Sequence, residues 1–243
     1  MTGLSGQPRR WGAALIAILC GSCGILSEAP KRQLYRVNPT ISFSAPLPHV
    51  AAQLLVAVPN APAGLDTARV ALSRSPVSLD YFADAEWTDR VPLLVQSAMI
   101  EGFERSSAVP AVGRDNAGLR ADFILETDVR DFSAVYDSPA QPPIVSVVVN
   151  VKLIKIPEHK IVGQNSTTRR QRAAANSIPE VVRAFDAALG GVVEEVVRWV
   201  VTNTALSGRR GSLFWPRFVH ASRVEVGAGE LARTRGGRGD CAA

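Results

Sequence analysis

The feature that most constrains the fold is a run of alternating apolar and polar residues between Ile144 and Ile156. Val or Leu occupies every odd position from 145 to 153, whereas Ser146, Asn150 and Lys152 occupy even positions. Successive side chains of a strand point to opposite faces, so this pattern predicts a strand with one buried face. The other face is expected to meet water or a partner.

Further strands are predicted on both sides of this one. The segments 122–132 and 161–172 are compatible with strands, and the short polar link 157–160 predicts an antiparallel hairpin between the middle strand and the last. A short strand is predicted at 34–37, and an apolar run follows at 53–58. Two further short candidate strands, at 70–72 and 77–81, are separated by the turn-like residues 73–76.

Two amphipathic helices are also predicted. The first begins near Asp89, because Thr88 and Asp89 are favourable N-caps and Pro92 is tolerated in a first turn. The second begins after Ser177, which Glu180 follows three residues later, as in a capping box. The order of the elements predicts an α+β domain in which an antiparallel sheet carries both helices packed on one face.

The first 22 residues have the layout of a secretory signal peptide, because two arginines precede a short uncharged apolar run, 11–19. Small residues precede Cys23, as in a bacterial lipobox, so Cys23 is the candidate lipidation site. Cys20 is the weaker candidate because the bulky Leu19 precedes it. The alternative is a cleaved soluble signal peptide with two incidental cysteines.

The predicted organisation has four parts. A signal peptide at 1–22 and a tether at 23–33 precede a domain at 34–205, and a disordered tail rich in Gly and Arg follows at 206–243. Most of the formal net charge of +5 lies in the signal peptide and the tail. The domain itself is therefore close to neutral and lacks the basic surface that nucleic acid requires.

The chain contains no recognisable catalytic, metal or nucleotide-binding motif, and no cofactor is predicted. Its histidines are dispersed, at positions 49, 159 and 220. Two acidic sets are candidates for acid-base chemistry: Asp80, Asp84, Glu86 and Asp89 near the first helix, and the pair Glu126 and Asp128 on one strand face. A solvated loop explains the first set, and a solvent-facing stripe beside Arg130 explains the second.

Several segments resemble the signature of the ABC-type transport auxiliary lipoproteins. They are a Thr-Ala-Arg-Val strand at 67–70, an aromatic pair at 81–82, a Trp-x-Asp-x-x-Pro helix start at 87–92 and an Ala-Asp-aromatic-x-Leu strand at 121–125. The resemblance runs from Gln33 to Asn203. The positions that carry the family motifs are Thr67, Arg69, Tyr81, Trp87, Asp89, Pro92, Asp122 and Trp199.

The resemblance implies a non-enzymatic lipoprotein that faces the periplasm and partners an MCE-domain transporter. In such a system an ATPase, a permease and an MCE substrate-binding protein move phospholipid-like molecules between the envelope membranes. The chain would be an outer-membrane dock or scaffold. Analogy with related family members leaves the formation of homo-oligomers as an open possibility. Gly24 after the cysteine favours outer-membrane sorting, since the Asp linked to inner-membrane retention is missing. The alternatives are an envelope enzyme that uses the acidic loop and an assembly lipoprotein of an unrelated envelope machine.

Overall fold

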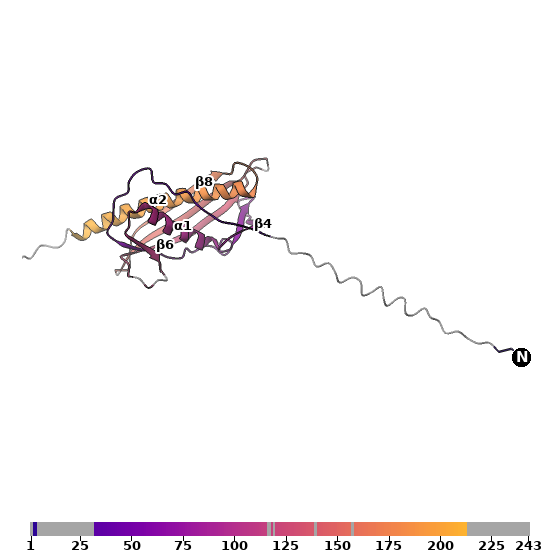
Figure 1. Ribbon diagram of the computed structural model, residues 1–243, viewed down its shortest axis with the longest axis horizontal. Coiled ribbons are helices and arrows are strands. Elements are labelled where there is room, and N and C mark those ends of the chain that lie inside the picture. Colours follow the sequence, from indigo (N-terminus) through magenta and orange to yellow (C-terminus); the bar gives the residue numbers. More distant parts are fainter. Residues whose placement is uncertain are drawn as a thin grey trace, which may run out of the picture.

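The structure is a computed structural model. It describes residues 2–3, 32–115, 118, 120–138, 140–156 and 158–212, with side chains to 205. Apart from residues 2–3, the predicted signal peptide lies outside the described residues, as do Cys23 and the tail beyond Ser212. The chain order is β1 (Gln33–Tyr35), β2 (Gln53–Val56), β3 (Arg69–Ser73), β4 (Asp80–Trp87), α1 (Val91–Ser106), β5 (Ala111–Arg114), β6 (Phe123–Val135), β7 (Ile144–Lys155), β8 (Lys160–Arg172) and α2 (Ile178–Ser212) (Figure 1).

The three long strands β6, β7 and β8 form an antiparallel unit, as predicted. β7 pairs with β6 on one side and with β8 on the other, along nearly its whole length. The alternating pattern in β7 is confirmed, because the Val and Leu side chains at 145, 147, 149, 151 and 153 are fully buried. These side chains provide much of the core under helix α2, which packs on β7 and β8.

Strand β6 joins this unit to the rest of the sheet. Its first residues pair in parallel with β2, and its last residues pair in parallel with β3. β2 also pairs in parallel with β5, and β1 in parallel with β4, while β3 and β4 form an antiparallel hairpin. The expectation of a wholly antiparallel sheet was therefore wrong. The sheet is mixed, because segments on the N-terminal side of β6 join it by crossover connections instead of tight turns.

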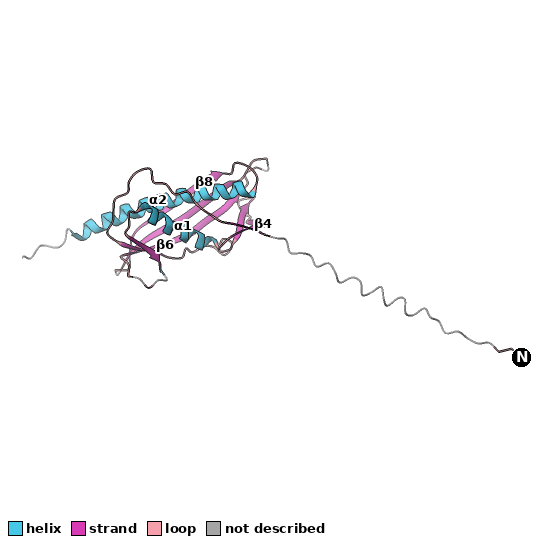
Figure 2. Ribbon diagram, viewed as in Figure 1, coloured by secondary structure: helices cyan, strands magenta, loops and turns pink. Residues whose placement is uncertain are grey.

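Both helices cover the same face of this sheet, as predicted, and the α+β class is confirmed (Figure 2). α1 packs on β2, β5 and α2. The two helices approach closely at Gly102, where a Cβ atom would lie 2.2 Å from Cγ1 of Val193. The core thus lies in one layer between the sheet and the helix pair.

Helix α1 begins later than predicted. Its N-cap is Arg90, which has an extended backbone and no side-chain capping bond, and Pro92 lies in the first turn. Thr88 and Asp89 are therefore not N-caps, and Asp89 Oδ1 instead accepts a hydrogen bond from the N–H of Arg90 at 2.8 Å. The helix starts later because two backbone hydrogen bonds keep residues 88–91 attached to neighbouring segments. Thr88 N donates to Tyr35 O, and Val91 N donates to Thr67 O.

Helix α2 begins where predicted, directly after Ser177. The carbonyl of Ser177 accepts the first helical bond, from Val181 N, at 3.0 Å. Glu180 accepts hydrogen bonds from Arg183 on the next turn of the helix. The helix continues to Ser212, so that residues 206–212, which were assigned to the tail, are helical.

Candidate functional site

Six of the eight family-motif residues come together around the β3–β4 hairpin and the start of α1. The Arg69 guanidinium lies 3.6 Å from the centre of the Tyr81 ring, and the Tyr81 hydroxyl donates to Gly64 O at 2.9 Å. Thr67 Oγ1 accepts from Arg69 N at 3.2 Å. These contacts tie the loop before β3 to strand β4. Asp89 and Pro92 follow at the junction with α1.

Trp87 is the largest side chain of this cluster and is 1% exposed. Its ring packs edge-on against Phe185 and Phe132, with centroid distances of 5.1 and 6.0 Å, and these two rings stack on each other. These two aromatic partners belong to α2 and β6. Its Nε1 is buried without a hydrogen-bond partner. The residue therefore acts through packing.

The other two motif residues lie elsewhere and also hold the fold together. Asp122 joins β2 to the start of β6, because its Oδ2 accepts from Gln53 N at 2.8 Å and its own N–H donates to Gln53 O at 3.0 Å. Trp199 lies on α2 against β8, where a Cβ at Gly163 would be 3.0 Å from Trp199 Cζ2. The motif positions thus mark contacts between elements and do not form one reactive centre.

Three of the four acidic residues near α1 lie in a strand and not in the expected loop, whereas Asp89 lies in the bend between this strand and α1. Residues 80–87 form strand β4, whereas the predicted strand ended at Tyr81. Asp80 lies 3.8 Å from Arg74, and Glu86 forms an ion pair with Arg32. Asp84 is exposed. Asp80 and Glu86 lie six positions apart at opposite ends of this strand, each with its own arginine partner, so these two carboxylates do not converge on a common substrate position.

The second acidic set lies on the sheet face away from the helices. Glu126 is exposed opposite Lys152 of β7. Asp128 lies 3.6 Å from Arg130 and 3.8 Å from Lys152. The interpretation as a charged, solvent-facing stripe therefore accounts for this pair.

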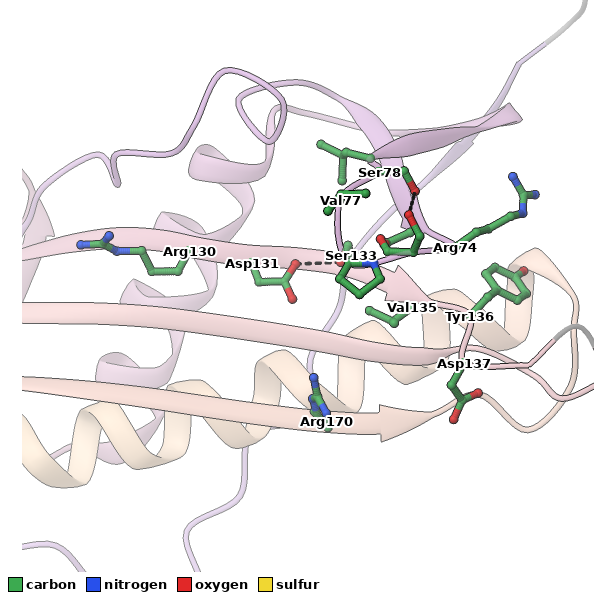
Figure 3. Close-up of a pocket in the computed structure, with 14 residues that line it drawn as sticks. Arg74, Val77, Ser78, Arg130, Asp131, Ser133, Val135, Tyr136, Asp137 and Arg170 are labelled. Atoms are coloured by element: carbon green, nitrogen blue, oxygen red, sulfur yellow. Dashed lines mark hydrogen bonds between the residues drawn. The ribbon is translucent and has the colours of Figure 1, made fainter.

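An open cavity of about 860 Å³ lies on this same outer face, beneath the β3–β4 connection (Figure 3). Pro76 and Leu79 line it from the connection, and Asp131, Ser133 and Arg170 line it from the sheet. The carboxylate of Asp131 is engaged there, because Ser133 Oγ donates to it at 2.7 Å. At its margin, hydrogen bonds from Arg172 hold the pKa of Asp137 below its ordinary value.

Sequence reasoning missed this cavity because a β-bulge creates part of it. The register of β6 with β7 shifts between Val129 and Asp131, which places Asp131 opposite Val148 on the outer face. Strict alternation from Val129 would have placed Asp131 in the core. The polar residues at 131 and 133 inside an apolar strand were the only local signal of this shift.

The described residues offer little for catalysis. Within them, no group of three or more His, Cys, Asp or Glu side chains could hold a metal ion. His159 lies in the β7–β8 turn, where its φ of 49° is left-handed. His220 lies outside the described part of the chain. A search of the described helices found none with the length and apolar character needed to cross a membrane.

Comparisons with known proteins agree with the motifs. Residues 35–197 match the family described as the ABC-type transport auxiliary lipoprotein component. A crystal structure of a Xanthomonas campestris protein is similar, with 25% identity and a TM-score of 0.69, over 73% of this chain and 99% of that one. Another crystal structure shares the fold, with 13% identity and a TM-score of 0.55, over 70% of this chain and 99% of that one.

A protein of Bradyrhizobium diazoefficiens is 30% identical over 154 residues, which is 63% of this chain. The match covers 40% of that relative, so the chain spans two-fifths of the length of this larger protein. The 154 matched residues are close in number to the folded domain described here.

Proposed function

Because the chain belongs to the family of ABC-type transport auxiliary lipoproteins, we propose that it is the docking or scaffold subunit of an MCE-type system that moves lipids between envelope membranes. Its partners would be the MCE-domain substrate-binding protein and the permease and ATPase of that system. The observation that carries this proposal is the extent of the family match, which runs from the end of β1 to Val197 in α2. The match therefore includes almost the whole folded unit.

The arrangement of the polar side chains supports a binding role over a catalytic one. Asp80 and Glu86 each have an arginine partner, and the carboxylate of Asp131 accepts the hydroxyl of Ser133. Catalytic acids and bases need a shared substrate position and suitable pKa values. Asp80 and Glu86 instead lie at opposite ends of β4, and Asp131 lies on β6. The proposal of an envelope enzyme that uses the acidic stretch is therefore the weaker of the two.

Attachment to the membrane is part of the proposal. Cys23 would carry the lipid after removal of residues 1–22, and residues 23–33 would tether the domain to the outer membrane, facing the periplasm. Palmitate labelling of the wild-type chain and its loss in Cys23→Ala would support this, whereas labelling that survives in Cys23→Ala would assign the anchor to another residue. Membrane fractionation with the inner membrane would contradict outer-membrane sorting.

The partner is tested by purification of the full-length chain from detergent-solubilised membranes after mild cross-linking, with mass spectrometry of what co-purifies. We expect the MCE-domain protein and its permease. A matched control is the Cys23→Ala variant, which should fold equally well but lose its place at the membrane. Recovery of components of another envelope machine, without MCE or permease subunits, would favour the assembly-lipoprotein alternative. The masses of intact complexes would also report any homo-oligomer.

A further inference from the structure

The connection between β3 and β4 presents an apolar tip to solvent. Val77 is 96% exposed, its neighbour Pro76 is exposed, and Leu79 is 43% exposed. Isolated exposed apolar residues are common on protein surfaces. Val77 and Leu79, however, lie beside Pro76 in a turn, where Gly, Pro, Asn, Asp and Ser are usual and large aliphatic side chains are not.

The tip is held in a defined shape. Ser78 N donates to Ser75 O at 3.2 Å, and Ser75 Oγ donates to Ser78 Oγ at 2.9 Å. Ser73 Oγ donates to Ser75 O at 2.7 Å. Pro76 fixes the backbone at the second turn position, which limits the freedom of the turn further. The apolar side chains are therefore presented by an ordered turn, and little conformational freedom is lost when they are buried.

The tip also stands clear of the sheet. The cavity of about 860 Å³ lies between the connection and the outer face of the sheet. In Figure 3, Val77 lies on the connection, above the strand that carries Asp131 and Ser133. The apolar atoms of Val77 consequently have no cover from the described part of the domain. Burial would have to come from outside it.

The tip lies within reach of a membrane that holds Cys23. Arg32, the first described residue of the domain, forms an ion pair with Glu86 near the end of β4. The tip directly precedes the start of β4 and so lies at the opposite end of this strand. An eight-residue strand is about 25 Å long. The nine residues from Cys23 to Arg32 can extend to about 30 Å. An anchored domain can therefore place the tip on the surface that carries its own anchor.

We propose that residues 76–79 insert into the headgroup region of the lipid surface to which the chain is anchored, and so give the domain a second membrane contact that fixes its orientation. This inference rests on the lipid anchor of the proposed function. The anchor makes the second contact intramolecular, so a small apolar area is sufficient to bias orientation. Arg74 lies 3.8 Å from Asp80, so the charges beside the tip nearly cancel. The contact is therefore apolar in origin and needs no anionic lipid.

The test uses the full-length acylated chain in vesicles of phosphatidylcholine. Cys20→Leu and Cys241→Ser leave Cys23 for the anchor, and Val77→Cys carries an environment-sensitive nitrobenzoxadiazole label. The matched control is Ile161→Cys, an apolar position that is 53% exposed. Ile161 lies next to the β7–β8 turn, which is near the start of β6. Strand β3, which leads into the tip, pairs with the last residues of β6 instead. Lipid spin-labelled near the headgroup is the quencher.

We expect quenching at position 77 to be at least twice that at position 161, with blue-shifted emission only at position 77. Equal quenching at both positions, with the protein still floating with the vesicles, would overturn the inference and leave the anchor intact. Failure to float would refute the anchor and the inference together. Protection at position 77 that grows with the protein-to-lipid ratio would identify a second copy of the chain as the occupant, and would also overturn the inference.

Discussion

Trp87 is the side chain on which β4, β6 and α2 converge, through its contacts with Phe132 and Phe185. We expect Trp87→Ala to lower the free energy of unfolding by roughly 3 to 5 kcal/mol, because a large buried aromatic leaves a cavity. Chemical denaturation of the domain measures this. Trp87→Phe is the matched control and should cost less, because Nε1 makes no hydrogen bond that could be lost. Equal losses in the two variants would mean that the indole NH has a hidden role.

The carboxylates of β4 are expected to tolerate neutral substitution. Asp84→Asn and Glu86→Gln should leave a folded protein that still complements an envelope-permeability defect, since Asp84 is exposed and the Arg32–Glu86 pair is partly solvent-exposed. Exposed ion pairs contribute at most about 1 kcal/mol. Wild-type stability with complete loss of complementation by Glu86→Gln would return the enzymatic alternative to consideration.

Asp186 on α2 should make stability depend on pH. Burial raises its pKa above the ordinary value of 3.8, although Asn38 N donates a hydrogen bond to its Oδ1 at 2.7 Å. A carboxyl with a raised folded-state pKa favours folding at low pH, and this contribution is lost as the pH rises through the folded pKa.

Asp186→Asn keeps an oxygen acceptor for Asn38 but cannot ionise. We therefore expect the variant to be more stable than wild type in urea at pH 7, and the difference to shrink toward zero below pH 3.8. Thr202 on the same helix is exposed and carries no ionisable group, so Thr202→Ser serves as a control that should show no pH dependence in this range. A wild type that is more stable at pH 7 would show that the hydrogen bond to the charged oxygen outweighs burial.

At the scale of elements, two adjacent glycines in α2 distinguish the effect of a close backbone contact from the effect of helix propensity. A Cβ at Gly190 would lie 2.6 Å from the backbone oxygen of Thr40, whereas a Cβ at Gly191 would lie 3.1 Å from Nε of the flexible Arg169 side chain. Replacement of helical Gly by Ala ordinarily gains up to about 1 kcal/mol. We expect Gly191→Ala to be neutral or stabilising and Gly190→Ala to be destabilising, as measured by thermal melts. Equal behaviour would contradict the close approach of residue 40 to α2.

The elements that could be predicted from the sequence are those whose residue pattern lies within a few neighbouring positions. The alternation in β7 and the start of α2 after Ser177 both arise within a few residues, and both are confirmed. The parallel pairing of β2 with β6 joins residues about 70 positions apart, and no periodicity reveals it. Strand β5 was missed because its four residues, Ala-Val-Gly-Arg, include a single β-branched side chain and no alternating pattern. The bulge at 129–131 similarly concealed which residues of β6 line the outer cavity.

For the whole molecule, the domain boundary on the C-terminal side can be tested by truncation. A stop after Ala205 should lower the free energy of unfolding by no more than about 1 kcal/mol, because the buried valines of α2 end at Val201 and the lost segment is an extension of the helix. A stop after Trp199 is the control. It removes two buried valines, each worth about 1.5 to 3 kcal/mol. A large fall in melting temperature with the stop after Ala205 would place part of the tail in the domain.

The position of β6 has a consequence for the order in which the domain assembles. β2 and β3 both pair with β6, which follows them in the chain, so these N-terminal strands lack their central partner until β6 has been synthesised and exported. The β6–β7–β8 meander, in contrast, needs only neighbouring hairpins and closes quickly because its contacts are local. We therefore expect the meander to form first and to be the template onto which the earlier half of the chain docks. In pulsed hydrogen exchange, amides of β7 should gain protection before those of β2.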